Sequence, residues 1–171
     1  MILLSLAQVQ VDLMQLKKGI ELGKQVLLVE KYKPGGECTW AGCIPSKALI
    51  QIADEIFTAK KYGNVTHSSN IMSKVRRLTE EAHQGEAVEV LVGEGIDYFN
   101  GTAKFENENM INVNDTLISA DYIVISTSSS TYVPPIKGLE SIHYLTNENV
   151  FKLTDLPKSL IVVGAGQLEL S

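Results

Sequence analysis

Two apolar runs separated by a helix-like segment open the chain, and they constrain its fold more than any other feature. Residues 1–6 and 26–29 are apolar runs of the kind that form buried parallel strands. Between them, residues 8–22 carry apolar side chains near helical spacing, and Gly23 follows as a helix-terminating glycine. Strand, helix and strand within about thirty residues predict one βαβ unit, whose crossover is right-handed.

Beyond this unit, the pattern predicts helices followed by short strands. Gly and Pro residues make residues 31–43 loop-like. Later the apolar period changes to two, with Asn- and Asp-rich turns between the runs. The expected elements are helices at 44–62 and 71–92, strands at 97–105, 110–113, 116–119, 122–126 and 160–163, and a loop at 127–158. The predicted fold class is therefore α/β, with a parallel βαβ core, helices and a small antiparallel β-meander.

Charge and hydropathy exclude several classes of protein. The 171 residues include 15 Lys and Arg against 20 Asp and Glu, a net charge of −5. A nucleic-acid binder needs a basic face to neutralise phosphates, so this balance argues against one. No run approaches the ~20 apolar residues that span a bilayer, and residues 1–6 lack the basic lead of a signal peptide. We therefore expect a cytoplasmic protein without membrane contact.

Cys38 and Cys43 are the only cysteines, and they lie at a predicted loop-to-helix junction. A helix N-terminus favours a thiolate, and Lys47 adds a positive charge one turn further on. Five steps along a regular helix rise ~7.5 Å, which is beyond the ~7 Å between Cα atoms that a disulfide allows. If the two cysteines pair, Cys38 must therefore lie outside the regular helix, and Gly42 is well placed to allow that bend.

Spacing alone leaves alternatives to a redox pair. Two buried and inert cysteines are equally compatible with it. Zinc is a weaker hypothesis, because the three histidines show no ligand-pair spacing: His67, His83 and His143. Other polar and aromatic residues have structural interpretations: surface histidines at 67 and 83, a solvated helix face at Arg76-Arg77, and Trp40 either packed under the loop or stacked on a ligand.

The cysteine segment resembles the active-site motif of the flavoprotein disulfide reductases. That motif is two glycines, a residue, Cys, four residues, Cys, and then x-Pro-Ser-Lys, and residues 35–47 match it throughout. Thr39-Trp40 between the cysteines looks most like mercuric-reductase-like members. Further segments resemble other parts of the family: the strand ending at Glu30, the strands at 101–105 and 120–125, the loop at 134–138 and the stretch 156–166.

The resemblance implies roles for individual residues. Cys38 would be the interchange thiol that attacks substrate, Cys43 the charge-transfer thiol against the flavin, and Lys47 a neighbour of the flavin's reactive nitrogen. Glu30 would hydrogen-bond the adenosine ribose of FAD. The implied cofactor-binding residues are Glu30, Gly36, Thr39, Gly42, Lys47, Ala103, Ser126 and Ser128. No metal site is implied.

The chain departs from the family pattern at the phosphate loop. Ala7, Val9 and Asp12 stand where the family has the glycines that let the backbone approach the FAD pyrophosphate. An aspartate ~4 Å from a phosphate charge costs ~4 kcal/mol at an effective dielectric of 20, so weakened FAD binding is expected. Ser128 likewise replaces a glycine near the flavin, where positive φ or a close approach is needed.

The resemblance also predicts a domain division. Residues 1–150 would form an incomplete FAD-binding domain of Rossmann type, and residues 151–171 the linker and first strand of a truncated NAD(P)H-binding domain. The rest of that domain and the family's dimerisation domain, which supplies a His–Glu acid–base pair, would be absent. Residues 159–163 would then pair onto an existing sheet, recruit another chain or fray.

These features lead to three hypotheses. In the first, the chain belongs to an oxidoreductase that passes electrons from NAD(P)H through FAD to the Cys38–Cys43 disulfide, and then to a small disulfide or metal-ion substrate; such enzymes are homodimers. In the second, it is an inactive truncated remnant. In the third, it is a redox-sensing module that uses the cysteine pair alone. The terminal electron acceptor and the choice of NADH or NADPH stay open.

Overall fold

The structure, a computed structural model, describes residues 2–7, 10–63 and 70–164. The elements are β1 (Ile2–Ala7), α1 (Gln10–Glu21), β2 (Gln25–Glu30), α2 (Gly36–Ala41), α3 (Cys43–Tyr62), α4 (Ile71–His83), the short 3₁₀ helix η1 (Gln84–Glu86), α5 (Val88–Gly93), β3 (Ile96–Asn100), β4 (Ala103–Asn107), β5 (Met110–Val113), β6 (Thr116–Ser119), β7 (Tyr122–Ser126), a second 3₁₀ helix η2 (Leu139–Ser141) and α6 (Asn147–Val150).

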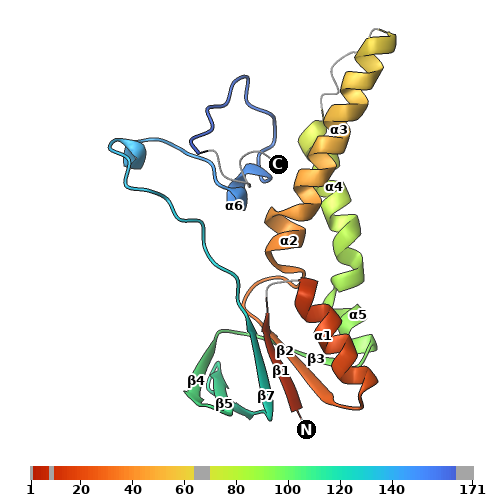
Figure 1. Cartoon of the computed structure of the whole chain (residues 1–171), viewed down its shortest axis with the longest axis vertical. Helices are drawn as coiled ribbons and strands as arrows, with labels where there is room; N and C mark the ends of the chain where they lie inside the picture. The colour runs from red at the N-terminus through yellow and green to blue at the C-terminus, as the bar shows by residue number, and fades with distance from the viewer. Residues whose placement is uncertain (1, 8–9, 64–69, 165–171) are drawn as a thin grey trace.

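A four-stranded parallel sheet forms the centre of the chain, with strand order β3-β2-β1-β7 (Figure 1). Leu4 of β1 lies opposite Leu27 of β2 on one side and Ile123 of β7 on the other. The predicted βαβ unit is therefore confirmed as β1-α1-β2. Gly23, which adopts φ +68, ends α1 as expected.

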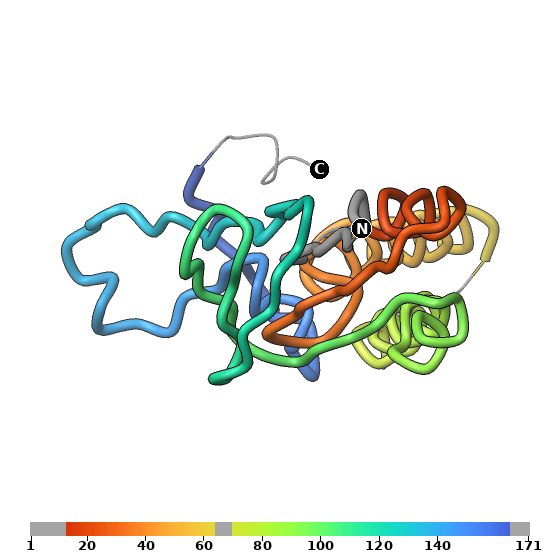
Figure 2. Tube along the Cα trace, turned by 90° about the horizontal axis from the view of Figure 1, so that it is seen from below, coloured from red at the N-terminus to blue at the C-terminus, as the bar shows by residue number. Residues whose placement is uncertain are grey.

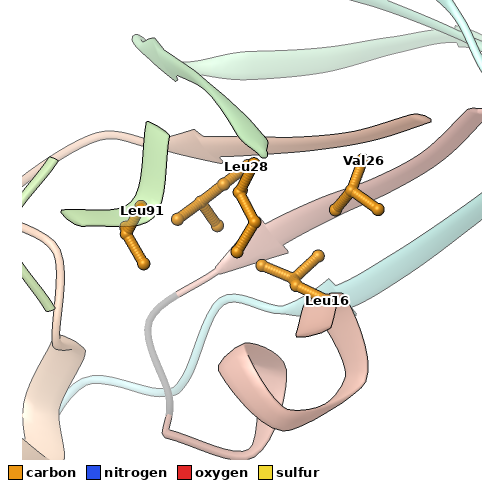
Figure 3. Packing of buried hydrophobic residues seen from close by; sticks show 5 residues of the cluster. Leu16, Val26, Leu28 and Leu91 are labelled. Carbon is orange, nitrogen blue, oxygen red and sulfur yellow. The ribbon is translucent and has the colours of Figure 1, made fainter. Parts of the chain in front are cut away.

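Helices cover one face of this sheet. Val26 and Leu28 of β2 point to that face, where they pack against Leu16 of α1 and Leu91 of α5 (Figure 3). Ile96 of β3 completes this buried cluster. The alternation explains why residues 26–29 read as a continuous apolar run, since the intervening side chains are covered from the other side.

A second sheet covers that other face. Strands β4, β5 and β6 form an antiparallel meander, and Ile111 and Val113 of β5 pack with Val29 of β2 and Ala120. Figure 2 shows the meander and helix α1 on opposite sides of β2. The meander was predicted, but the single strand expected at 97–105 is wrong. It is two strands, β3 in the parallel sheet and β4 in the meander, separated at Gly101 and Thr102.

Helices α3 and α4 pack side by side and project away from the sheets (Figure 1). Ala48, Ile52 and Val75 form their buried contact. The continuous helix expected at 71–92 is wrong, because it breaks into α4, η1 and α5. Ala87 is extended at φ −63 and ψ 149, and this turn lets Leu91 face the sheet instead of α3. Among the helices of the described part of the chain, none is long and apolar enough to cross a membrane.

The segment after β7 is mostly irregular, as expected, and it docks onto the helices. Asn147 Nδ2 of α6 donates a hydrogen bond of 2.6 Å to Glu37 Oε1 of α2. Phe151 packs against the α3–α4 cluster, and Arg76 Nη1 donates to the Leu153 carbonyl. Arg76 is therefore half-buried, and its interpretation as part of a solvated helix face is wrong.

The strand expected at 160–163 is not formed. Within the described range, residues 160–164 have no regular secondary structure and pair with neither sheet, and Ile161 is 88% exposed. The sequence has the β-branched composition of a strand there, but a strand forms only where another strand supplies hydrogen-bonding partners.

Candidate active site

A sharp bend joins the two helices that carry the cysteines. The predicted loop at 31–43 in fact contains helix α2, which ends at Ala41; α3 begins at Cys43. Gly42 lies between them at φ −137 and ψ −114. A Cβ at Gly42 would sit 3.1 Å from the carbonyl oxygen of Glu37 and 3.3 Å from Cα of Cys38, so any larger residue would push these backbone atoms away. The predicted bend at Gly42 is confirmed.

The bend brings the two thiols into contact. Both cysteines are reduced, Cys38 half-buried and Cys43 exposed. The pKa of Cys38 is raised to about 11, first by burial and then by a hydrogen bond to the Cys43 side chain; the charges of Cys43 and Glu86 add to the rise, and a backbone hydrogen bond from Cys43 opposes it. The N-terminus of a helix was expected to stabilise a thiolate here. The backbone N–H of Cys43, at the start of α3, has this effect on Cys38, but the effect of burial is larger.

Helix α2 is held by its aromatic side chain. Trp40 Nε1 donates a hydrogen bond of 2.8 Å to the Pro34 carbonyl, and the Trp40 ring lies 4.5 Å from the His83 ring. The Lys33 ammonium lies 4.8 Å from the Trp40 ring centre. Trp40 therefore packs against the loop and α4, which was one of its two interpretations. These contacts compensate for the weak intrinsic stability of a six-residue helix.

His83 was expected on the surface, and that expectation is wrong. It is half-buried against Trp40, and its Nδ1 atom is buried without a hydrogen-bond partner. Burial lowers the pKa of His83, the charge of Lys33 lowers it as well, and the charges of Glu86 and Glu89 oppose this. His67 lies outside the described residues.

A cavity of about 1010 Å³ opens beside α2, at the carboxyl ends of parallel strands. Residues that follow β2, β3 and β7 line it, as do one side of α2 and part of α4. Ligands of α/β sheets bind at this edge, and the volume is at the upper end of the range for small-molecule sites. Several cations of the lining balance its carboxylates: Lys31, Lys33, Arg76 and Lys152 against Glu30, Glu37, Glu80 and Glu148.

The structure brings some of the expected cofactor-binding residues together. The ones that line the cavity are Glu30, Gly36, Ala103 and Ser128. The ones outside its lining are Thr39, Gly42, Lys47 and Ser126. Ala41 and Pro45 line the cavity on either side of Cys43, so the cysteine pair lies at its border. Lys47 is exposed and lies about one turn after Cys43, the first residue of α3.

Glu30 occupies the position expected for it. It ends β2, is only 2% exposed, and its Oε1 atom accepts a hydrogen bond of 2.8 Å from the backbone N–H of Tyr32. This contact fixes the carboxylate at the mouth of the sheet. An acidic residue at this strand end is the usual partner of a ribose hydroxyl.

The backbone at Ser128 has the positive φ expected at a position where the family has glycine. Its φ is +56, in the left-handed region that glycine adopts without cost. The phosphate loop is the other place where the sequence departs from the family pattern. There, Ala7 ends β1 opposite Ser126 of β7, and Asp12 falls within α1. Val9 lies outside the described residues.

Thr39 has a partner that the sequence did not indicate. It is 2% exposed, and its Oγ1 atom donates a hydrogen bond of 2.8 Å to Glu86 Oε2. The residues lie 47 positions apart, and Glu86 belongs to a segment that periodicity assigned to the middle of a helix. Gly85, a helix-breaking residue, was the one sequence signal for this turn.

Comparison with known proteins identifies the family. The family profile described as "Pyridine nucleotide-disulphide oxidoreductase" matches residues 13–168. The chain belongs to this family. Its members are flavoproteins that use FAD and NAD(P)H, so the resemblance of the cysteine motif and the predicted α/β fold are both confirmed.

Individual relatives agree with this assignment. A mercuric reductase of Lysinibacillus sphaericus is 32% identical over 160 residues, covering 88% of this chain and 29% of that protein. A dihydrolipoyl dehydrogenase of Acholeplasma laidlawii is 31% identical, covering 87% and 48%. The solved HOCl-induced flavoprotein disulfide reductase RclA of Escherichia coli superimposes with a TM-score of 0.77 at 22% identity, covering 92% of this chain and 35% of RclA. The chain thus spans less than half of the length of these relatives.

The cavity has the size and the place expected for the family's cofactor. It lies at the carboxyl edge of the parallel sheet, has a buried carboxylate at the end of β2, and is bordered by the cysteine pair. Gly36, at φ +61, is buried in its wall and exposes backbone to it without a side chain.

Proposed function

We propose that this chain forms the FAD-binding portion of an oxidoreductase that reduces a small disulfide or a metal ion, with Cys38 and Cys43 as its redox pair. The observation that carries the proposal is the bend at Gly42, which puts the two thiols in contact at the border of the cavity. The proposal assigns residues 1–150 to FAD binding and residues 151–171 to the connection toward a domain that binds NAD(P)H.

The residues of the chain would share the work as follows. Bound FAD would supply two-electron transfer between NAD(P)H and the cysteine pair. Glu30 would hold the ribose, while Gly36, Ala103 and Ser128 would line the cofactor. The Cys38–Cys43 disulfide takes up two electrons and two protons to give two thiols. When the pair is oxidised again, a disulfide substrate would receive these two electrons and two protons.

The burial of Cys38 sets a condition on this chemistry. With its pKa at about 11, about one Cys38 thiol in ten thousand is ionised at pH 7. Because the thiolate is the nucleophile, a base must take the proton when Cys38 attacks a substrate.

Flavin binding and electron uptake test the proposal together. We expect the purified chain to bind added FAD, and the complex to take up four electrons per flavin from dithionite when the cysteine pair is oxidised at the start. Two of these electrons reduce the flavin, and two reduce the disulfide. The Cys38→Ser variant should bind FAD equally and take up two electrons. Failure to bind FAD at high concentration would overturn the proposal, as would equal electron uptake by both proteins.

A second function is favoured by the exposure of Cys43, whose thiol contacts Cys38 from the solvent side of the bend. The pair could form a disulfide in response to an oxidant without any flavin. Thiol titration of flavin-free protein, before and after mild oxidant, tests this sensor function. Loss of both thiols as an intramolecular disulfide supports it, and two thiols that persist exclude it.

A further inference from the structure

The carboxylate of Glu86 reaches the cysteine helix from a distant part of the sequence. Glu86 ends η1, directly after α4, and its Oε2 atom accepts the 2.8 Å hydrogen bond of Thr39 Oγ1. Thr39 follows Cys38 in α2 and is almost fully buried. A Cβ at Gly35 would collide with the Glu86 carboxylate, so the acid is fitted closely against the start of α2.

We propose that Glu86 is a positioning residue for the Cys38–Cys43 pair, which fixes α2 through Thr39 and presents a negative charge to the Cys38 thiol. It is not a member of the family's cysteine motif, and it touches neither cysteine through a hydrogen bond in the contacts described above. The inference rests on the proposed function only for the attacking role of Cys38. Its test uses flavin-free protein, so it can fail while FAD binding succeeds.

The hydrogen bond to Thr39, the neighbour of Cys38 in α2, places the Glu86 charge close to the cysteine helix in a partly buried setting. Thr39 is 2% exposed, and Glu86 is half-buried beside it, so the interaction is less screened than one between surface charges. Accordingly, the charge of Glu86 contributes to the raised pKa of Cys38. A negative charge disfavours a second one nearby, so the carboxylate adds to the effects of burial and of Cys43 in keeping the thiol protonated.

Other charged groups lie around α2, and they define suitable controls. Cys43 acts on Cys38 from α3. His83 of α4 and Lys33 contact the Trp40 ring and are not among the charges that affect Cys38. On α2 itself Glu37 is bound to Asn147 of α6. Glu89 of α5 acts on His83 and is not among the charges that affect Cys38. Glu89 therefore offers a matched change of charge three residues from Glu86.

The experiment measures how fast iodoacetamide alkylates Cys38 at different pH values. In the Cys43→Ser background Cys38 is the sole thiol, since the chain has two cysteines. Glu86→Gln removes the charge and keeps an oxygen that accepts from Thr39. We expect its alkylation midpoint to fall and its rate at pH 8 to rise by up to about threefold. Glu89→Gln should leave the profile unchanged.

Two more variants separate charge from structure. Glu86→Asp keeps the charge, so its midpoint should stay close to that of the parent. Thr39→Val removes the hydrogen bond and keeps the charge, so amide hydrogen exchange in α2 should become faster while the midpoint moves less than in Glu86→Gln. The proposal is overturned if Glu86→Gln has the parent's profile, if Glu89→Gln shifts it equally, or if Glu86→Asp or Thr39→Val shifts it as far as Glu86→Gln.

Discussion

Replacing Gly42 by alanine would test the bend that joins the two cysteines. The added Cβ would sit 3.1 Å from the carbonyl oxygen of Glu37 and 3.3 Å from Cα of Cys38. Both are backbone atoms, so the clash cannot be relieved by rotating a side chain, and α2 and α3 must move apart. Overpacking of this kind costs about 1–3 kcal/mol. We expect the free energy of unfolding of Gly42→Ala to fall by that amount in a urea titration.

The same displacement should slow the pairing of the thiols. Disulfide formation depends on the relative position of two sulfur atoms; a misplacement on the order of 1 Å costs up to about a hundredfold in comparable intramolecular reactions, and the displacement here is smaller. We therefore expect the Cys38–Cys43 disulfide to form roughly threefold to tenfold more slowly in Gly42→Ala, measured with oxidised glutathione and thiol titration.

Gly93→Ala is the matched control, because a Cβ at Gly93 meets nothing within 4 Å. Gly93 is the last residue of α5, where alanine is the better helix former, so its stability should be unchanged or higher by up to about 1 kcal/mol. The reasoning is refuted if Gly42→Ala matches Gly93→Ala both in stability and in the rate of disulfide formation.

Three further predictions each rest on one feature of the structure: a backbone dihedral angle, a raised pKa and a hydrogen bond. Ser128→Gly should raise the free energy of unfolding by about 0.5–1 kcal/mol, since φ +56 is costly for serine; an unchanged or lower value in a urea titration contradicts this. Because the pKa of Cys38 is raised to about 11 from 9.0, the stability it contributes is present below pH 9 and is lost as pH rises toward 11. Wild type should therefore lose stability faster than Cys38→Ser across that range, and parallel curves would refute it. Asn147→Ala removes the hydrogen bond to Glu37, so amide exchange should accelerate in α6, and unchanged exchange rates would show that the contact does not hold the segment.

Local patterns predicted the centre of the fold well. The βαβ unit follows from two apolar runs at the spacing of paired parallel strands, and the bend at Gly42 follows from the length of a helix between two cysteines. The left-handed backbone at Ser128 was likewise predicted, because a glycine position of the family implies positive φ. These features depend on residues close together in the sequence.

The features that sequence could not predict depend on distant contacts. Helix α2 forms in a glycine-rich segment because Trp40 and Thr39 find partners in Pro34, His83 and Glu86. The helix expected at 71–92 breaks because Leu91 packs on the sheet while Val75 packs on α3. The apolar run at 160–163 has strand composition without a neighbouring strand to pair with in the described chain. In each case tertiary contacts override local propensity.

Mapping the disulfide of flavin-free protein after mild oxidation tests the central claim most directly. If the bend holds the two thiols in contact, mass spectrometry will find that the peptide containing Cys38 and Cys43 has lost two hydrogen atoms and that no disulfide joins two chains. Two free thiols after oxidation, or a disulfide between two chains, would contradict the account.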